Sequence, residues 1–535
     1  MFIPRRLADS STSPFYFLYT RFFILLLLAS FLLLSETSMT TQAATLSVPA
    51  GGDLQSAINE ARGGDVIELQ AGASFVGPFT LPVKSGESYI TVQSSHLAAL
   101  PAEGERVTPA DAQWMPKILS AGRGEPALRT APSAHHFRFI GIEFAPTDAS
   151  AMMYHVIGLG SVGAEQDTLS EVPHHLQFDR CYIHAHPTQQ LIRGVMLNSA
   201  ETSITNCYIS DFKAKGFDSQ AIAGWNGPGP YKIINNYLEG AGENIIFGGS
   251  DPSIANLVPS DIEIRRNHLS KPLSWRGVWT VKNLFELKNA RRVQVTGNVM
   301  EHNWGDAQTG EAILLTVRNQ DGGAPWSVVE DVELTNNIVR HVGAGINVLG
   351  HDYYHASQQT KRIVVRNNFF DDIDGVRWQG RGEFLLITEG AGELIIDHNT
   401  VRQTGSVIMA GGGEHQPLTF TNNIIAHNEY GIKGDGTASG NQSLATYFPQ
   451  AKVLRNLIVG ANAAKYPADN FYPADFSAAR FVDATNGIYQ LRADSKYRGR
   501  GTDGKDLGCD FEALAAALPP ALGQGLLRKL KSAAF

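Results

Sequence analysis

Two short segments place charged side chains where a β-strand would turn them to one surface. In the first, NLFELKN, the apolar residues Phe285 and Leu287 alternate with Glu286 and Lys288. Successive side chains of a strand point to opposite faces. Burial of the apolar pair would therefore bring Glu286 and Lys288 together on the outer face.

The second segment, AILLTVRNQ, follows the same rule. With Leu315 and Val317 buried, Thr316 and Arg318 face outward, and Arg318 follows Lys288 by 30 residues. Cleaving a uronic-acid polysaccharide by β-elimination requires neutralising the sugar carboxylate, removing the adjacent proton and assisting the leaving oxygen. A lysine with cationic neighbours can serve as a base, while arginine stays charged. The catalytic candidates are Lys288 as base and Arg318 as carboxylate binder or acid.

The region around this pair is rich in cations and tryptophans. Residues 265–292 hold eight basic side chains and one acidic one, an excess of +7 in a chain of net charge −8. A stripe of such charge would attract a polyanion; the alternative is a solvated face balanced by acids nearby. Loop tryptophans could stack on sugars or act as packing lids. The substrate-binding candidates are Glu286, Arg276, Lys282, Arg291, Arg292, Trp304 and Trp326.

A repeat supplies the elements that must position these residues. One asparagine column recurs at intervals of 31, 31, 39, 31 and 31 residues, and the extra residues of the long interval fall after Arg318. Several short apolar runs in each unit are typical of an all-β parallel β-helix, in which coils stack about 4.8 Å apart. Asparagine tolerates left-handed turns and its amides can bond along the stack, so the column is structural. Its members are Asn236, Asn267, Asn298, Asn337, Asn368 and Asn399.

Composition and the termini complete the organisation. The chain of 535 residues has 53 glycines, 43% hydrophobic and 18% charged residues, which indicates a soluble protein with many turns. We expect a signal peptide at 1–43, a β-helix domain at 44–510 opened by an N-terminal capping helix, and a C-terminal cap at 511–535. The protein would be secreted or periplasmic, with no membrane contact after signal cleavage and no nucleic-acid partner. Three cysteines are too few for a disulfide scaffold.

The repeat columns, the capping helix and the closing segment GTDGKDLGCD resemble the right-handed parallel β-helix of the pectin-lyase-like superfamily. Lys288 and Arg318 resemble the lysine and arginine on successive coils of its chondroitinase-B and alginate-lyase branch. That branch also holds Ca²⁺ with an asparagine and two acids. The positions available for it here are Glu243, Asn244 and Glu286.

We favour a monomeric polysaccharide lyase acting on an acidic polysaccharide. Two other classes stay open. If Glu286, Lys288 and Arg318 only form an outward ion-pair ladder, the protein is a non-catalytic carbohydrate-binding or surface-structural β-helix. A glycoside hydrolase would need a base or paired carboxylates, and the 16 histidines show no regular metal spacing. The candidates for a hydrolase are His302, His351, Asp352, Asp371, Asp372 and Glu389.

Overall fold

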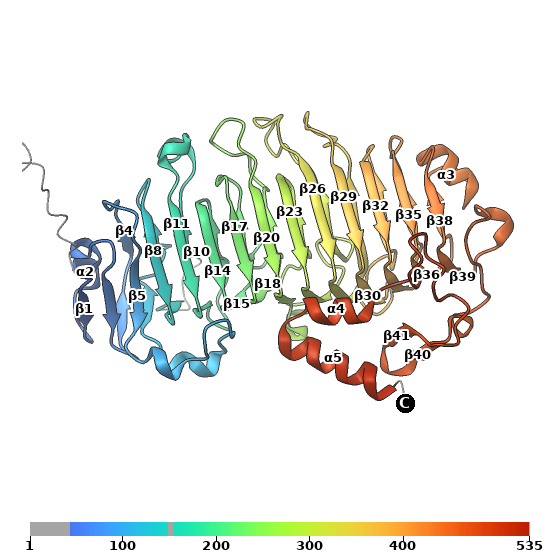
Figure 1. The fold of residues 1–535 in the computed structure, drawn as a ribbon. Coiled ribbons are helices and arrows are strands. Elements are labelled where there is room, and N and C mark those ends of the chain that lie inside the picture. The colour runs from blue at the N-terminus through green and yellow to red at the C-terminus, as the bar shows by residue number, and fades with distance from the viewer. Residues whose placement is uncertain (1–42, 123, 148–152, 534–535) are drawn as a thin grey trace, which may run out of the picture. The chain divides into compact units, whose positions relative to one another are not determined.

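The computed structural model describes residues 43–122, 124–147 and 153–533 (Figure 1). Residues 45–535 form one compact unit. The predicted signal peptide lies outside the described residues except for its last position. In the described part of the chain, no helix is long and apolar enough to span a membrane.

Three long parallel sheets run the length of this unit, and their strands alternate along the chain in the order expected of a right-handed β-helix. Among the described residues they contain 14, 13 and 12 strands, and one small antiparallel sheet lies outside them. The predicted all-β fold is confirmed.

The 14-stranded sheet contains, in spatial order, β1 (Thr45–Val48), β2 (Val66–Leu69), β5 (Ile90–Ser94), β8 (His135–Ile140), β11 (His174–Asp179), β14 (Ala200–Thr205), β17 (Tyr231–Ile234), β20 (Ser260–Arg265), β23 (Ala290–Thr296), β26 (Val329–Thr335), β29 (Lys361–Arg366), β32 (Gly392–Asp397), β35 (Leu418–Thr421) and β38 (Lys452–Leu454).

The 13-stranded sheet contains β3 (Ser74–Val76), β6 (Lys117–Ser120), β9 (Glu143–Pro146), β12 (Tyr182–His184), β15 (Tyr208–Phe212), β18 (Tyr237–Gly240), β21 (His268–Ser270), β24 (Val299–Asn303), β27 (Ile338–Val342), β30 (Phe369–Ile373), β33 (Thr400–Gln403), β36 (Ile424–Ala426) and β39 (Leu457–Val459).

The 12-stranded sheet contains β4 (Phe79–Leu81), β7 (Leu128–Thr130), β10 (Met153–Leu159), β13 (Leu191–Leu197), β16 (Gln220–Gly224), β19 (Glu243–Phe247), β22 (Asn283–Leu287), β25 (Glu311–Thr316), β28 (Ala344–Leu349), β31 (Leu385–Thr388), β34 (Ile408–Ala410) and β37 (Ile432–Gly434). The separate pair is β40 (Phe481–Asp483) and β41 (Ile488–Leu491).

Stacked apolar side chains fill the interior. Ile245, Phe285, Ile313 and Ile346 are register partners on four successive coils, and each is at most 1% exposed. Burying one such side chain stabilises the fold by about 1.5–3 kcal/mol. The hydrophobic column thus fixes which residues of the 12-stranded sheet must face outward.

The asparagine column is a continuous hydrogen-bonded ladder. The Oδ1 atom of Asn298 accepts from the backbone N of Asn267 at 2.9 Å and from its Nδ2 at 3.0 Å. Asn298 in turn donates through Nδ2 to Ile264 O and to Asn337 Oδ1. Each amide therefore satisfies backbone groups that the turn leaves inside the protein.

The predicted reason for asparagine was wrong in one respect. The left-handed backbone conformation falls on the residue before the ladder position, as at Asn235 with φ 57°, Arg266 with φ 58° and Gly297 with φ 68°. At Gly297 a side chain would also collide with Ala517 O, 2.2 Å from an added Cβ. Asparagine is needed in the ladder for its amide and not for its backbone freedom.

Two cysteines continue the ladder toward the N-terminus. Cys207 N donates to Asn236 Oδ1, and Cys181 N donates to Cys207 Sγ at 3.4 Å. Both are free thiols with no exposed surface. Burial raises the pKa of Cys207, so this pair is a packed extension of the column.

Helices cover parts of this array. The N-terminal capping helix α2 (Leu54–Glu60) buries Leu54, Ala57 and Ile58 and is capped by Asp53. Toward the other end, α3 (Asn441–Tyr447) packs near β37.

The segment predicted as a C-terminal cap forms α4 (Phe511–Ala517) and α5 (Pro520–Ala533). Figure 1 shows these two helices beside the middle strands. Phe511 and Leu514 pack with Val299 and Phe369, so the segment covers a side of the 13-stranded sheet.

Replacing Asn298 with alanine should lower the free energy of unfolding by about 2–4 kcal/mol, because several buried backbone and amide groups lose their partners. Urea unfolding followed by tryptophan fluorescence measures this. Gln294→Ala, at an exposed position of β23 in the same coil, is the control, with an expected change within about 0.5 kcal/mol. Equal effects of the two substitutions would contradict the ladder's role.

Candidate active site

The residues predicted for chemistry meet on the outer face of the 12-stranded sheet. Phe285, Leu287, Leu315 and Val317 belong to the buried core, as predicted. Glu286, Lys288, Thr316 and Arg318 line one hollow of about 260 Å³, together with Gln308, Thr309, Glu311, Leu314, Asn347 and Tyr353. The two catalytic candidates therefore share a cavity.

Arg318 is held in place from the previous coil and the next one. Its backbone N donates to Lys288 O at 2.9 Å. Its guanidinium donates to Asp352 Oδ1 at 3.0 Å and to the Tyr353 hydroxyl at 2.9 Å, and lies 4.4 Å from the Tyr353 ring centre. Asp352 is buried and Tyr353 is 57% exposed. The Arg318 guanidinium is thus fixed in orientation, while the edge formed by Tyr353 stays open to solvent.

Lys288 lies beside the buried carboxylate of Glu286. Its Nζ is 3.6 Å from Glu286 Oε1, and Asn283 Nδ2 donates to Glu286 Oε2 at 3.0 Å. Lys288 also lines a second hollow of about 80 Å³ whose other walls include Arg193, Asp218, Gln220 and Trp225. This lysine therefore borders two hollows on the same sheet.

Lys282, predicted to bind substrate, is an internal cation. Its Nζ lies 2.8 Å from both Glu243 Oε1 and Asp218 Oδ2, and the residue is 9% exposed. Burial alone would lower the pKa of Lys282, but the negative charges of Glu243, Glu286 and Asp218 outweigh it and raise the pKa above its ordinary value. The ammonium group neutralises the acids beneath the site.

The positions predicted for Ca²⁺ do not fit that ion. Asn244 points into the protein, where its Oδ1 accepts from Lys271 Nζ at 3.1 Å and its Nδ2 donates to Leu238 O and Ser270 O. Glu243 accepts from Gln220 Nε2 and is paired with Lys282. Because Asn244 is turned away and a lysine already neutralises Glu243, the three side chains do not converge as oxygen ligands.

Lys271, the partner of Asn244, is itself a buried cation. Its Nζ also donates to the carbonyl oxygens of Gly240, Gly242 and Asn283. Burial lowers its pKa to about 7. It anchors the corner behind the site and is not exposed to ligand.

The predicted basic stripe is not one surface. Arg291 and Arg292 belong to β23 on the 14-stranded sheet, where Arg291 donates to Ser260 Oγ and Arg292 pairs with Asp261. Arg276 lies in a loop and donates to Arg377 O at 2.7 Å. Their sequence proximity to Lys288 reflects one coil wrapping around three sheets.

The predicted tryptophan platforms are also separated from Lys288 and Arg318. Trp304 is 1% exposed and packs with Trp275, Val281 and Trp378. Trp326 is half-buried and donates through Nε1 to Leu257 O. Trp225, which lines the second hollow beneath Arg193 at 5.0 Å, is the tryptophan that borders Lys288.

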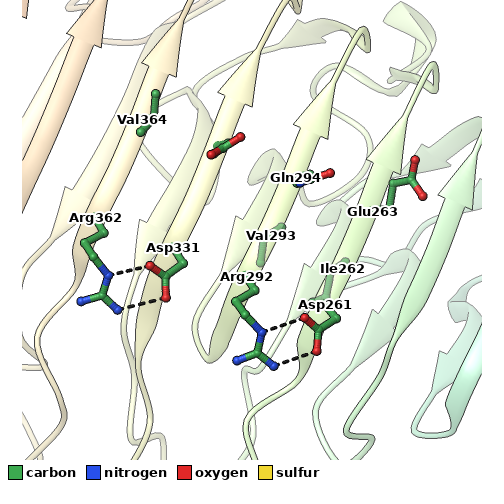
Figure 2. A pocket seen from close by; sticks show the side chains of 10 residues that line it. Asp261, Ile262, Glu263, Arg292, Val293, Gln294, Asp331, Arg362 and Val364 are labelled. Atoms are coloured by element: carbon green, nitrogen blue, oxygen red, sulfur yellow. Dashed lines mark hydrogen bonds and ion pairs between the residues drawn. The ribbon is translucent and has the colours of Figure 1, made fainter.

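A larger hollow of about 760 Å³ lies on the 14-stranded sheet. Figure 2 shows two matched pairs on its wall, Arg292 with Asp261 and Arg362 with Asp331, and the wall also carries the acids Glu263 and Glu333. Two guanidinium nitrogens of Arg292, Nε and Nη2, each donate to the Asp261 carboxylate at 2.7 Å. Because these charges already neutralise each other, the hollow offers little to an acidic ligand, and we place the site at Lys288.

Sequence reasoning missed a carboxylate pair on the same sheet as Lys288. Glu311 and Glu383 lie two coils apart, and Ala344 and Gly345 occupy the coil between them. Both acids are almost fully buried. Burial, with a smaller contribution from the charge of Glu311, raises the pKa of Glu383 to about 7. Only the small residues of the intervening coil hint at this pair in the sequence.

The hydrolase candidates named from sequence lie elsewhere or are already paired. Asp371 pairs with Arg402, and Asp372 pairs with His341 and Arg377 on the 13-stranded sheet. His302 stacks on His341. His351 contacts Glu389 O, and Asp352 accepts a hydrogen bond from Arg318.

No protein-family model and no curated protein sequence matches this chain. A PL6 family polysaccharide lyase from Pseudopedobacter saltans is 12% identical and covers 86% of this chain and 99% of its own, with a TM-score of 0.46. A GH87 α-1,3-glucanase from Streptomyces thermodiastaticus is 12% identical, covering 82% and 72%, with a TM-score of 0.47. An alginate lyase from Paenibacillus sp. is 13% identical, covering 77% and 99%, with a TM-score of 0.33. These likenesses concern the β-helix fold alone.

Replacing Lys282 with methionine should lower the free energy of unfolding by about 3–5 kcal/mol, because Glu243 would remain buried without its cation. Thermal and urea unfolding measure the loss. Lys361→Met, at a partly exposed pair with Glu330, is the matched control, with an expected effect of about 0–1 kcal/mol. A wild-type stability for Lys282→Met would refute the internal-cation role.

The raised pKa of Glu383 predicts a pH dependence of stability. The folded pKa of about 7 exceeds the unfolded value, so the protonated carboxyl stabilises the fold fully at acidic pH. This contribution, about 3 kcal/mol, is lost as pH rises through the folded pKa. Unfolding of Glu383→Gln should therefore depend less on pH between about pH 5 and pH 8 than unfolding of the wild type. The exposed Glu414→Gln should keep the wild-type dependence, and an unchanged slope in Glu383→Gln would contradict the assignment.

Proposed function

We propose that this protein cleaves an acidic, uronic-acid-containing polysaccharide by β-elimination on the outer face of its 12-stranded sheet. The observation that carries the proposal is the shared hollow of Lys288 and Arg318, with Asn347 and Tyr353 on its wall. A fixed guanidinium and a nearby amine are the groups that a uronate substrate requires. The chain would act outside the cytoplasm as a monomer, with 1–43 as its export signal and 44–510 as the β-helix domain.

Each side chain has a distinct task in this reaction. Arg318, held by Asp352, pairs with the sugar carboxylate and stabilises the charge that develops when the adjacent proton leaves. The Lys288 side-chain nitrogen accepts that proton, and Glu286 at 3.6 Å stabilises the resulting ammonium. The Tyr353 hydroxyl, which accepts from Arg318, is placed to give a proton to the leaving oxygen. No step requires a metal ion.

A second candidate, a glycoside hydrolase, is favoured by Glu311 and Glu383. Two coil spacings separate their strands by about 9.6 Å. This strand spacing lies just above the separation of about 6.5–9.5 Å between the carboxyl groups of inverting enzymes. Glu383, with its pKa raised to about 7, would be the acid and Glu311 the base. This site is adjacent to Lys288, so both reactions would use the same sheet.

Incubation with alginate, pectate, chondroitin and heparin tests the proposal. We expect at least one to give unsaturated products that absorb in the ultraviolet. Lys288→Ala and Arg318→Ala should each lower kcat/KM by about 100-fold or more, because each removes a group used in the transition state. The matched controls Lys361→Ala and Arg362→Ala lie on the 14-stranded sheet and should leave the rate unchanged. A chelator should not reduce it.

The other outcomes separate the alternatives. New reducing ends without ultraviolet absorbance, lost in Glu311→Gln and Glu383→Gln, would replace the lyase with the hydrolase. Binding of an acidic glycan without cleavage would indicate a non-catalytic carbohydrate-binding protein. Cleavage that survives Lys288→Ala would overturn the assignment of the base.

A further inference from the structure

Four histidines gather on the outer face of the 14-stranded sheet, in the N-terminal third of the chain. They are the first two residues of β8, in HHFRFI, and of β11, in HHLQFD. His135 is the register partner of His174 on the next coil. The offset of 39 residues between the two pairs hides this cluster in the sequence, where the histidines show no regular metal spacing.

The imidazoles of the four histidines face one another closely. Nδ1 of His135 lies 2.8 Å from Nδ1 of His136, and the corresponding atoms of His174 and His175 are 2.7 Å apart. Across the coils, His135 stacks on His174 with ring centres 4.9 Å apart and His136 on His175 at 4.3 Å. One nitrogen from each of His136, His174 and His175 falls within 4.8 Å of the others.

The surroundings favour a ligand at these nitrogens. Glu201 Oε2 lies 2.7 Å from Nε2 of His175, which fixes that ring and leaves its Nδ1 toward the cluster. A carboxylate behind a histidine is the usual partner of a metal-bound imidazole.

The backbone holds the cluster in shape. His136 and His175 adopt the left-handed conformation, with φ 58° and 54°. The same position in later coils carries Asp261, Arg292 and Asp331, which pair by charge. At His136 and His175 the column instead presents two stacked imidazole rings.

We propose that His136, His174 and His175, with His135 as a fourth nitrogen donor, bind one transition-metal dication of the Zn²⁺ or Cu²⁺ class. A tetrahedral ion with N–metal bonds of about 2.0–2.1 Å needs nitrogens about 3.3 Å apart. The close Nδ1 pairs would therefore open by about half an ångström, which small side-chain rotations supply. The ion would join two coils on a sheet different from that of Lys288, so its role is to stabilise the fold.

A rival group, Glu301 with His302 and His341, has a similar set of ligand types. There the carboxylate of Glu301 is already bound by Arg340 Nε at 2.6 Å and His268 Nε2 at 2.8 Å. An arginine at this distance opposes a dication. This group is therefore the matched control.

The test uses the full protein without a histidine tag, stripped with chelator and titrated with Zn²⁺ by calorimetry and thermal unfolding. We expect one equivalent to bind and Tm to rise by roughly 2–3 °C at 100 times Kd. The double variant His136→Gln/His175→Gln should lose both effects, and His302→Gln/His341→Gln should retain them. The proposal would be overturned if Zn²⁺ does not bind stoichiometrically. It would also be overturned if His302→Gln/His341→Gln loses Zn²⁺ binding and His136→Gln/His175→Gln retains it.

A second measurement does not depend on how the variants fold. Electron paramagnetic resonance of the wild-type protein with one equivalent of Cu²⁺ should show hyperfine coupling to at least three nitrogens. A spectrum with oxygen ligands alone would refute the site even if the variants are unstable.

Discussion

The in-register stacking of parallel coils is the constraint on which the rest of this structure depends. Each side chain lies above its counterpart on the previous coil at the spacing of hydrogen-bonded strands, about 4.8 Å. Any polar group turned inward must then find its partner along the column. The ladder through Asn267, Asn298 and Asn337 meets this requirement, and Cys207 continues it where the space holds a thiol.

The same stacking builds surfaces. On the 14-stranded sheet, one outward column alternates Asp261, Arg292, Asp331 and Arg362, so each charge meets its opposite on the next coil. On the 12-stranded sheet the arrangement differs, because Lys282 neutralises the acids from below and leaves Lys288 and Arg318 at the surface. Lys288 and Arg318 are paired with Glu286 and Asp352, but both still line one hollow, so chemistry is possible on this sheet.

The sequence was sufficient for the fold and for the facing of the central strands. Period-two alternation correctly placed Phe285 and Leu287 inside and Glu286 and Lys288 outside, and the repeat correctly brought Arg318 beside Lys288. Alternation fails at strand ends, where a corner redirects the chain. Asn244 and Ile245 are consecutive, yet both point inward, which removed Asn244 from the predicted calcium ligands.

Features that depend on two coils at irregular spacing could not be predicted. One partner of Lys282 lies 64 residues away at Asp218, and Glu311 meets Glu383 across a coil of small residues. Nearness in sequence was also misleading, because residues 265–292 pass over three sheets within one coil. In this fold, the net charge of a sequence segment therefore does not predict the charge of a surface. The side chains that lie one coil apart do predict it.

The central claim is that an acidic saccharide binds across Lys288 and Arg318. A crystal structure of the catalytically impaired Lys288→Ala variant soaked with a uronic-acid oligosaccharide tests it most directly. The account predicts a sugar carboxylate within hydrogen-bonding distance of the Arg318 guanidinium, with the Tyr353 hydroxyl near a glycosidic oxygen. A saccharide seated instead on the 14-stranded sheet, against Arg292 and Arg362, would contradict it.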